Sequence, residues 1–204
     1  MSNWIQTFSC RRIDYENPQP DQVKIEDIAR SLARLPRFLG HTREFYSVAQ
    51  HSVGVCKILP FVWSAKEWAG WRKNEQRSLK REALLHDAVE AYTGDLPTPA
   101  KKSLGLPWRE MERRVDRRVR RALGLLGAEP WPVKVADQVA LYLEATGRNI
   151  GIRVGDWDYA FQPRVAEVVA RLPESVKIYV QTPLEEKVAR RNFLSNYRRL
   201  TDDD

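Results

Sequence analysis

Residues 84–99 read LLHDAVEAYTGDLPTP, and this stretch decides how the chain is interpreted. The adjacent residues His86 and Asp87 end an apolar run, Glu90 follows one helical turn later, and Asp95 precedes two prolines. Two neighbouring side chains of ligand type cannot both point into one apolar core, but both can face one metal ion. The stretch therefore predicts a metal site near the end of a helix.

The rest of the chain has the apolar spacing of helices and little strand signal. We expect helices at Ile25–Leu35, Ser47–Leu59, Leu79–Tyr92, Arg109–Leu126, Val133–Thr146, Pro163–Leu172 and Pro183–Leu200. Ser47 and Gln50 have the spacing of a capping box. We expect Trp63–Trp71 to be a short helix or loop, Asp95–Pro107 a loop, and Lys177–Val180 a short strand. The predicted fold class is all-α, a helical bundle with a metal site between helices.

Length and composition narrow the class of protein. A chain of 204 residues suits a single domain over residues 1–204. Cys10 and Cys56 have no metal-type or redox-type spacing, which is typical of a reducing compartment. The chain has no basic leader with an apolar segment, and no apolar run of the ~20 residues that a membrane span needs. We therefore expect a cytoplasmic protein that does not enter a membrane.

The net charge of +7 points to anionic partners, either nucleic acid or small anionic substrates. Arg109–Arg121 contains seven arginines, with Met111, Val115 and Val119 at helical spacing among them. This pattern is typical of an amphipathic helix with a solvated basic face. A phosphate-binding helix is the alternative, although no helix-turn-helix, zinc-finger or RNP-type motif accompanies it.

Further ligand-type residues lie on two other expected helices. His51 falls within Ser47–Leu59, and Asp137 lies one turn into Val133–Thr146. Facing helices of a bundle can hold a metal in this way. Two imidazoles with two carboxylates suit Mn, Fe, Co, Ni or Zn better than Ca. Taken singly, each residue has another reading: a hydrogen-bonded core histidine, or an aspartate paired with Lys134.

Four motifs in order resemble those of the HD-domain phosphohydrolases. They are Arg37–Thr42 (RFLGHT), Tyr46–Ser52 (YSVAQHS), His86–Lys101 (HDAVEAYTGDLPTPAK) and Val133–Asp137 (VKVAD), followed by a family-like helix at Asn192–Tyr197. The chain looks most similar to bacterial 5′-deoxynucleotidases and phage-encoded deoxynucleotide hydrolases. If the chain is itself phage-encoded, its compartment is the host cytoplasm. The order H…HD…D is complete.

The resemblance implies a role for each residue of the site. His51, His86, Asp87 and Asp137 would bind one divalent ion, which we expect to be Co, Mn, Mg or Zn. Glu90 would orient or deprotonate the attacking water, and Asp95 would act near the nucleophile or the leaving group. Arg37 would bind phosphate through its planar fork, with Arg43 as the fallback. Lys101 and His41 are weaker candidates for substrate contact.

The expected function is a metal-dependent phosphohydrolase of 2′-deoxynucleotides. We favour a triphosphohydrolase, of dATP type, that releases a deoxynucleoside and triphosphate. The alternative is a 5′-deoxynucleotidase acting on deoxynucleoside monophosphates. Two further readings are a nucleic-acid-binding protein that uses the Arg109–Arg121 helix and a cyclic-nucleotide phosphodiesterase. The expected partner is a small nucleotide, and the sequence leaves open a homo-oligomer.

Overall fold

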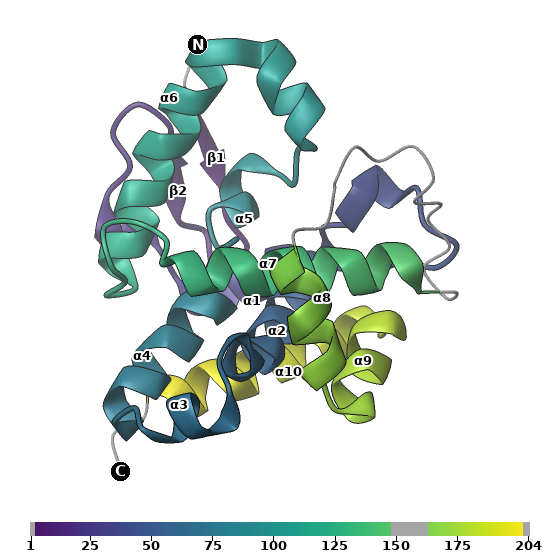
Figure 1. Cartoon of the computed structure of the whole chain (residues 1–204). Helices are drawn as coiled ribbons and strands as arrows, with labels where there is room; N and C mark the ends of the chain where they lie inside the picture. The colour runs from purple at the N-terminus through teal and green to yellow at the C-terminus, as the bar shows by residue number, and fades with distance from the viewer. Residues whose placement is uncertain (1–2, 148–162, 202–204) are drawn as a thin grey trace.

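The computed structural model describes residues 3–147 and 163–201, which fold mainly into helices (Figure 1). The helices are α1 (Ile25–Arg34), α2 (Val48–Ile58), α3 (Ala65–Ala69), α4 (Lys73–Leu84), α5 (Glu90–Thr93), α6 (Thr98–Ala122), α7 (Trp131–Thr146), α8 (Pro163–Arg171), α9 (Glu174–Gln181) and α10 (Glu186–Thr201). Short 3₁₀ helices lie at Pro20–Gln22, Arg37–Gly40 and Leu59–Val62. Strands β1 (Trp4–Gln6) and β2 (Arg12–Asp14) pair antiparallel, with Ile5 opposite Ile13. None of the helices in these ranges is both long and apolar enough to cross a membrane.

Helix α2 lies at the centre of the molecule. All of its residues except Lys57 are buried, and it packs against α1, α4, α7, α9 and α10. Its sequence is mostly apolar or small, and its polar residues Gln50, His51 and Ser52 are buried as well, which is typical of a helix at the centre of a core. A Cβ on Gly54 would lie 3.1 Å from Cγ2 of Val180, so the glycine lets α9 approach closely. The helix that carries His51 is therefore held rigidly from all sides.

Helix α7 runs across this centre and packs against α2, α4, α8 and α9 (Figure 1). Its apolar face is buried, and consists of Val133, Ala136, Val139, Ala140 and Leu143. Asp137 and Glu144 lie seven residues apart on the same helix, and two turns of α-helix bring them to one side. Helix α7 thus presents two acids towards α2.

The predicted helix over Leu79–Tyr92 is wrong in one respect, because it breaks before the His-Asp pair. Helix α4 ends at Leu84, and Leu85 has φ −109° and ψ 10°. The chain then winds more tightly: the Ala88 amide donates to the Leu85 carbonyl, and the Glu90 amide donates to the Asp87 carbonyl. His86 and Asp87 therefore lie in a turn between α4 and α5, and do not share a regular helical face with Glu90.

The predicted loop over Asp95–Pro107 is also wrong, because α6 begins at Thr98. Pro99 stands in the first turn of α6, where a missing amide hydrogen costs nothing. The helix kinks at Gly105, which has φ +69°, and Pro107 follows directly. These two residues suggested a loop, but the structure uses them to bend a helix.

The predicted strand at Lys177–Val180 is helical, and it belongs to α9. Its β-branched residues favour a strand, but Pro173 caps a helix here, and Val176 and Val180 at four-residue spacing both pack on the core. Strands β1 and β2 were not expected from the sequence. In α9, tertiary packing therefore overrides the local strand propensity.

Other expectations are confirmed. Helices α1, α2, α7 and α8 lie where the apolar spacing places them, and Trp63–Trp71 contains the short helix α3. The capping box on α2 forms only by half: the Ser47 hydroxyl accepts from the Gln50 amide. The Gln50 side chain instead donates to the Tyr179 and Thr182 carbonyls and accepts from the Leu184 amide. Gln50 thereby ties α2 to the segment between α9 and α10.

Candidate metal centre

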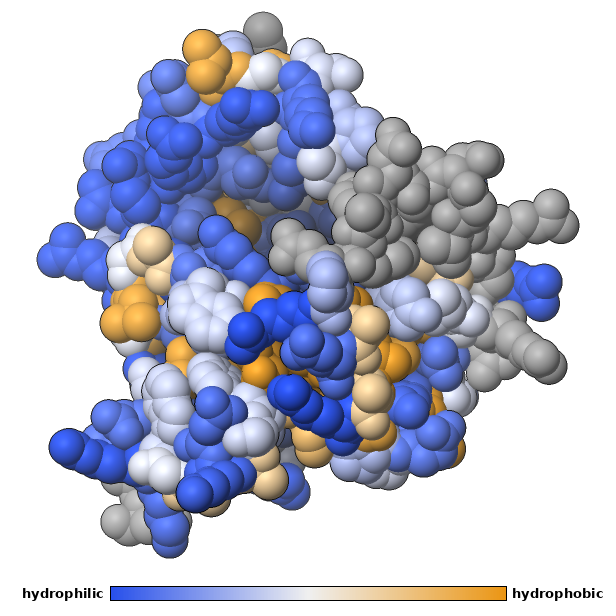
Figure 2. Space-filling view, viewed as in Figure 1, coloured by the Kyte–Doolittle hydropathy of each residue, from blue (hydrophilic) through white to orange (hydrophobic). Residues whose placement is uncertain are grey.

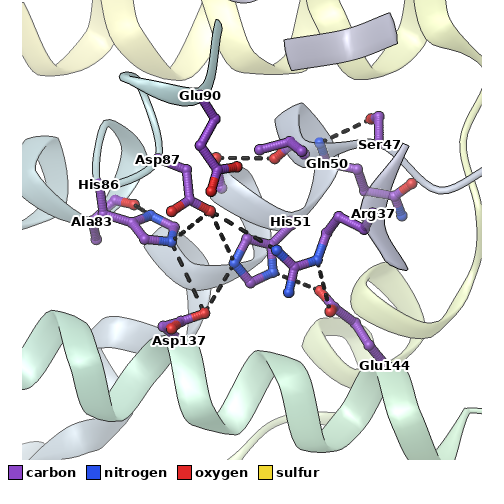
Figure 3. Close-up of polar contacts among 12 residues, drawn as sticks. Arg37, Ser47, Gln50, His51, Ala83, His86, Asp87, Glu90, Asp137 and Glu144 are labelled. Atoms are coloured by element: carbon purple, nitrogen blue, oxygen red, sulfur yellow. Dashed lines mark hydrogen bonds and ion pairs between the residues drawn. The ribbon is translucent and has the colours of Figure 1, made fainter. Parts of the chain in front are cut away.

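The four predicted metal ligands come together from three segments of the chain (Figure 3). His51 is on α2, His86 and Asp87 are in the turn after α4, and Asp137 is on α7. Nε2 of His51 lies 3.1 Å from Oδ1 of Asp137 and 3.6 Å from Oδ2 of Asp87. Nε2 of His86 lies 3.0 Å from Oδ2 of Asp87 and 4.0 Å from Oδ1 of Asp137. Donor atoms that share one ion at about 2.1 Å lie roughly 3–4 Å apart. Ligand atoms of His51, His86 and Asp137 all lie within 4.8 Å of one another, and Asp87 borders this group through its contacts with both imidazoles.

The hydrogen bonds of the two imidazoles leave the correct nitrogens for a metal. Nδ1 of His86 lies 2.9 Å from the Ala83 carbonyl, which can only accept, so Nδ1 carries the hydrogen. Nδ1 of His51 lies 2.6 Å from Oε1 of Glu144. Both Nε2 atoms are buried and make no hydrogen bond of good geometry to a described residue, although each lies 3.0–3.1 Å from an aspartate oxygen. Buried polar atoms without partners are costly, and a metal ion would satisfy both nitrogens.

The cluster is reachable from solvent on its aspartate side. The side chains of Asp87 and Asp137 are 20% and 40% exposed, whereas that of His51 is fully buried. A structural metal site is normally closed, while a catalytic site keeps open positions. The exposure of the two aspartates therefore favours a catalytic ion.

With both histidines neutral, the local charge is negative and attracts a cation or protons. Burial lowers the pKa of His86, but Asp87 and Asp137 outweigh it and raise that pKa to about 10. Burial and the charge of Arg37 lower the pKa of His51, but Glu144 and Asp137 leave it raised. Burial raises the pKa of Asp87, yet the two imidazoles and Arg37 hold it well below its usual range. Protons on the histidines thus supply positive charge that a divalent ion would replace.

This electrostatic balance predicts that ion binding depends on pH. Below its pKa of about 10, His86 holds a proton that an ion must displace. We expect binding of Mn²⁺ near pH 7.5 to release about one proton or more. The apparent affinity should therefore rise about tenfold per pH unit for each proton released. Calorimetric titration between pH 6.5 and 8.5, in buffers of different ionisation enthalpy, measures both quantities. An affinity that does not change with pH would contradict the assignment.

Arg37 reaches the cluster from the 3₁₀ turn Arg37–Gly40. Its side chain is only 11% exposed, its Nε donates to Oε2 of Glu144 at 3.1 Å, and its Nη1 lies 3.9 Å from Oδ2 of Asp87. Burial lowers the pKa of Arg37, but Glu144, Asp95 and Asp87 together raise it, so the group stays charged. Arg37 is therefore a buried, paired arginine rather than a surface residue.

The turn that carries Arg37 has an unusual backbone. Phe38 and Leu39 both have positive φ, 55° and 53°, which is uncommon for residues other than glycine. The Arg37 amide donates to the Tyr46 carbonyl, and Pro36 pairs with Ser47, so the turn is fixed at its base. Strained backbone of this kind persists only where the surroundings hold it. Here it directs Arg37 inward.

Glu90 points towards the cluster from the start of α5 (Figure 3). The residue is buried, and its Oε2 has no hydrogen-bond partner among the described residues. Burial, Asp87 and Asp95 raise the pKa of Glu90 well above its ordinary value, against the opposite effects of Lys101 and Arg37. Glu90 is therefore a buried acid beside the cluster rather than an exposed residue at a helix end.

The remaining candidates differ in how close they come to the cluster. Asp95 is half-buried, and burial raises its pKa while Arg37 lowers it. Lys101 Nζ lies 3.7 Å from Oε1 of Glu90 but 2.7 Å from Oε1 of Glu112, so it is already paired beside the site. His41 is exposed on the loop after the Arg37 turn, and none of the described contacts brings it to the cluster. Arg43 is exposed on the same loop.

Sequence reasoning missed Glu144, which is completely buried and contacts both His51 and Arg37. One signal was available. Glu144 lies seven residues after Asp137 on one helix, so the two acids face the same side. A charged residue at that spacing within an otherwise apolar stretch marks a second acid directed into the site.

Comparisons with known proteins identify relatives of the chain but no activity. No family model matches it. The chain is 37% identical over 155 residues to the uncharacterized protein YfdR of Escherichia coli, an alignment that covers 76% of each. It is 36% identical over 148 residues to the uncharacterized protein RCAP_rcc00048 of Rhodobacter capsulatus, covering 70% of this chain and 71% of the relative. Function must therefore be argued from the site.

Proposed function

We propose that this chain, which belongs to the protein family of YfdR and RCAP_rcc00048, is an HD-domain phosphohydrolase that uses one divalent ion to hydrolyse 2′-deoxynucleotides. One observation carries the proposal. His51, His86, Asp87 and Asp137 occur in the order H…HD…D and converge, with the buried Nε2 atoms of both histidines facing the two aspartates. An arginine and a protonatable glutamate border the same cluster.

The proposed reaction is attack of water on a phosphorus atom. The ion, when bound, would neutralise phosphoryl oxygens and make a nearby water more acidic. Arg37 binds the phosphoryl group through its guanidinium fork, which stays charged at any working pH. Glu90 accepts a proton from the attacking water, and a raised pKa brings this base closer to neutral pH. A new oxygen–phosphorus bond forms, and the bond to the 5′-oxygen breaks.

Asp95 is the second carboxyl group available for proton transfer. Burial raises its pKa, so it holds a proton more readily than an exposed aspartate. We assign Asp95 to the departing 5′-oxygen, which must gain a proton to leave as a hydroxyl group. Because their surroundings differ, one carboxyl group can accept the proton of the attacking water and the other can donate a proton to the departing oxygen.

The substrate could carry three phosphates or one. Attack at the α-phosphorus of a triphosphate gives a deoxynucleoside and triphosphate, and we favour this reaction. Attack on a monophosphate gives a deoxynucleoside and phosphate, and this reaction is the alternative. The pairing of Lys101 with Glu112 removes one cation that a longer anion would need, unless substrate displaces Glu112.

A substrate panel tests the proposal. Purified protein is incubated with deoxy- and ribonucleoside mono-, di- and triphosphates and with Mg²⁺, Mn²⁺ or Co²⁺. Phosphate, pyrophosphate and triphosphate are separated among the products. We expect a 2′-deoxynucleotide to be hydrolysed at least tenfold faster than its ribonucleotide, and EDTA to abolish the reaction. Absence of hydrolysis with every nucleotide and ion would overturn the proposal.

A nucleic-acid-binding role for α6 receives less support. Two of its arginines make contacts within the protein and are not free for phosphate: Arg120 pairs with Glu82 at 2.5 Å, and Arg114 donates to the Tyr15 carbonyl. Arg109, Arg113, Arg117 and Arg121 are exposed at four-residue spacing, and the face of the molecule around α6 is mainly hydrophilic (Figure 2). DNA binding that weakens steeply with salt and needs no metal would favour this alternative.

Arg37 provides a test of phosphate binding. Lysine keeps the charge but cannot make two parallel hydrogen bonds. We expect Arg37→Lys to lower turnover about 10–100-fold, because a hydrogen bond to a charged group contributes about 1.5–3 kcal/mol. The bound ion should remain. Arg43→Lys on the same loop is the matched control. If only the Michaelis constant changes, Arg37 serves ground-state binding alone. If only the Arg43 variant is impaired, the role passes to Arg43.

A further inference from the structure

The carboxylate of Glu144 contacts two different functional groups, one with each oxygen. Oε1 lies 2.6 Å from Nδ1 of His51, and Oε2 accepts from Nε of Arg37 at 3.1 Å (Figure 3). Its side chain is completely buried, and those of His51 and Arg37 are 0% and 11% exposed. One carboxylate therefore stands between a proposed metal ligand and the proposed phosphate-binding arginine.

A buried charge at this position is not needed for packing. The face of α7 around Glu144 is filled by Val139, Ala140 and Leu143, and an apolar side chain would continue that face. A structural ion pair with Arg37 would explain only one of the two oxygens. The contact of the other oxygen with His51 fixes which imidazole nitrogen carries a hydrogen. With Nδ1 donating to Glu144, the lone pair of Nε2 faces Asp87 and Asp137.

We infer that Glu144 is a positioning residue for both the candidate metal ligand His51 and the phosphate-binding Arg37. It holds His51 in the tautomer that can ligate an ion, and it holds the guanidinium of Arg37 beside the cluster. The phosphate half of this inference rests on the proposed function, whereas the metal half does not. Outer partners of ligating histidines typically change metal affinity 10–100-fold when they are removed.

Glu144→Gln separates the alternatives because an amide cannot accept at both ends. If the amide oxygen faces His51, the NH₂ group faces a second donor, Arg37, and that contact is lost. If the NH₂ group faces His51, Nδ1 must accept and the hydrogen moves to Nε2, which can then no longer bind an ion. Either orientation damages one of the two functions.

Glu82→Gln is the matched control. Glu82 is also a buried glutamate, and its oxygens accept from the Arg120 side chain and the Leu126 amide, away from the cluster. A glutamine at position 82 likewise could not accept from both of these donors. We expect both variants to lower the melting temperature. Only Glu144→Gln should weaken Mn²⁺ affinity or the affinity of the Mn²⁺-loaded protein for inorganic phosphate, one of them by 10–100-fold.

A measurement on the unmodified protein removes any dependence on the folding of the variant. In Zn²⁺-loaded protein, ¹⁵N NMR should show His51 bound through Nε2 with a hydrogen on Nδ1. Coordination through Nδ1, or a Glu144→Gln variant that binds Mn²⁺ and phosphate like the parent, would overturn the inference. So would equal losses in Glu82→Gln. A parent protein that binds Mn²⁺ but hydrolyses no nucleotide refutes the proposed function and leaves the role of Glu144 towards His51 intact.

Discussion

Replacing Asp87 with alanine should remove the bound ion and nucleotide hydrolysis together. Oδ2 of Asp87 lies 3.0 Å from Nε2 of His86 and 3.6 Å from Nε2 of His51, so it contacts both candidate imidazole ligands. Loss of a direct ligand should lower metal affinity by more than the roughly 10–100-fold seen when an outer hydrogen bond is lost. Metal content by mass spectrometry and turnover at saturating nucleotide measure the effect.

The variant should still fold. The apolar core around α2 and α7 consists of residues that do not depend on the ion, and Asp87→Ala also removes a repulsion that raises the pKa of Glu90. Asp116→Ala, which changes a half-buried acid on α6, is the matched control and should keep both metal and turnover. An Asp87→Ala protein that retains one ion per chain and full turnover would exclude the four-residue site.

The parts of the fold that the sequence predicts are those with a strong apolar period. Helices α1, α2 and α7 have continuous apolar faces, and the elements appear where those faces predict them. The turn after Leu84 could not be predicted in this way, because residues 79–92 keep a helical period across the break. Nothing in the local pattern shows that the chain changes from i→i+4 to i→i+3 hydrogen bonds there.

The convergence of the four candidate ligands was predictable because each is a ligand-type residue within a recognisable motif, and their order in the chain carries the information. The partners of those ligands were not. Glu144 has no motif of its own, and its role depends on how α7 crosses α2, which is a property of the folded chain. Arg37 was predicted to meet phosphate, but its support by Glu144 was likewise invisible before the helices were placed.

The total charge of the chain could be counted from the sequence, but the charge at the site could not. The net charge of +7 suggests affinity for anions over the whole surface. The site itself is different: Asp87, Asp137 and Glu144 gather there, and Arg37 and the protons on His51 and His86 balance their charge. A divalent ion that replaces the histidine protons would keep positive charge at the cluster for an anionic nucleotide. Local electrostatics therefore argue for a metal more strongly than the total charge argues for nucleic acid.

Glu90→Gln should lower turnover by about 10²–10⁴-fold, the usual contribution of a general acid–base group. The substitution keeps the shape of the side chain and removes its ability to accept a proton. Since Glu90 is not among the four ligands, the bound ion should remain. We therefore expect turnover to fall while the metal content stays the same.

The pH dependence gives the sharper test of the same residue. Burial and the charges of Asp87 and Asp95 raise the pKa of Glu90, so the carboxylate needed as a base is lost as the pH falls through that raised value. Turnover should rise with pH over the corresponding range in the parent protein, at saturating metal. This rise should disappear in Glu90→Gln and persist in Glu110→Gln, which changes an exposed acid on α6. If Glu90→Gln keeps both the turnover and the pH profile of the parent, another group accepts the proton. Asp95, whose pKa burial also raises, would then be the first residue to examine.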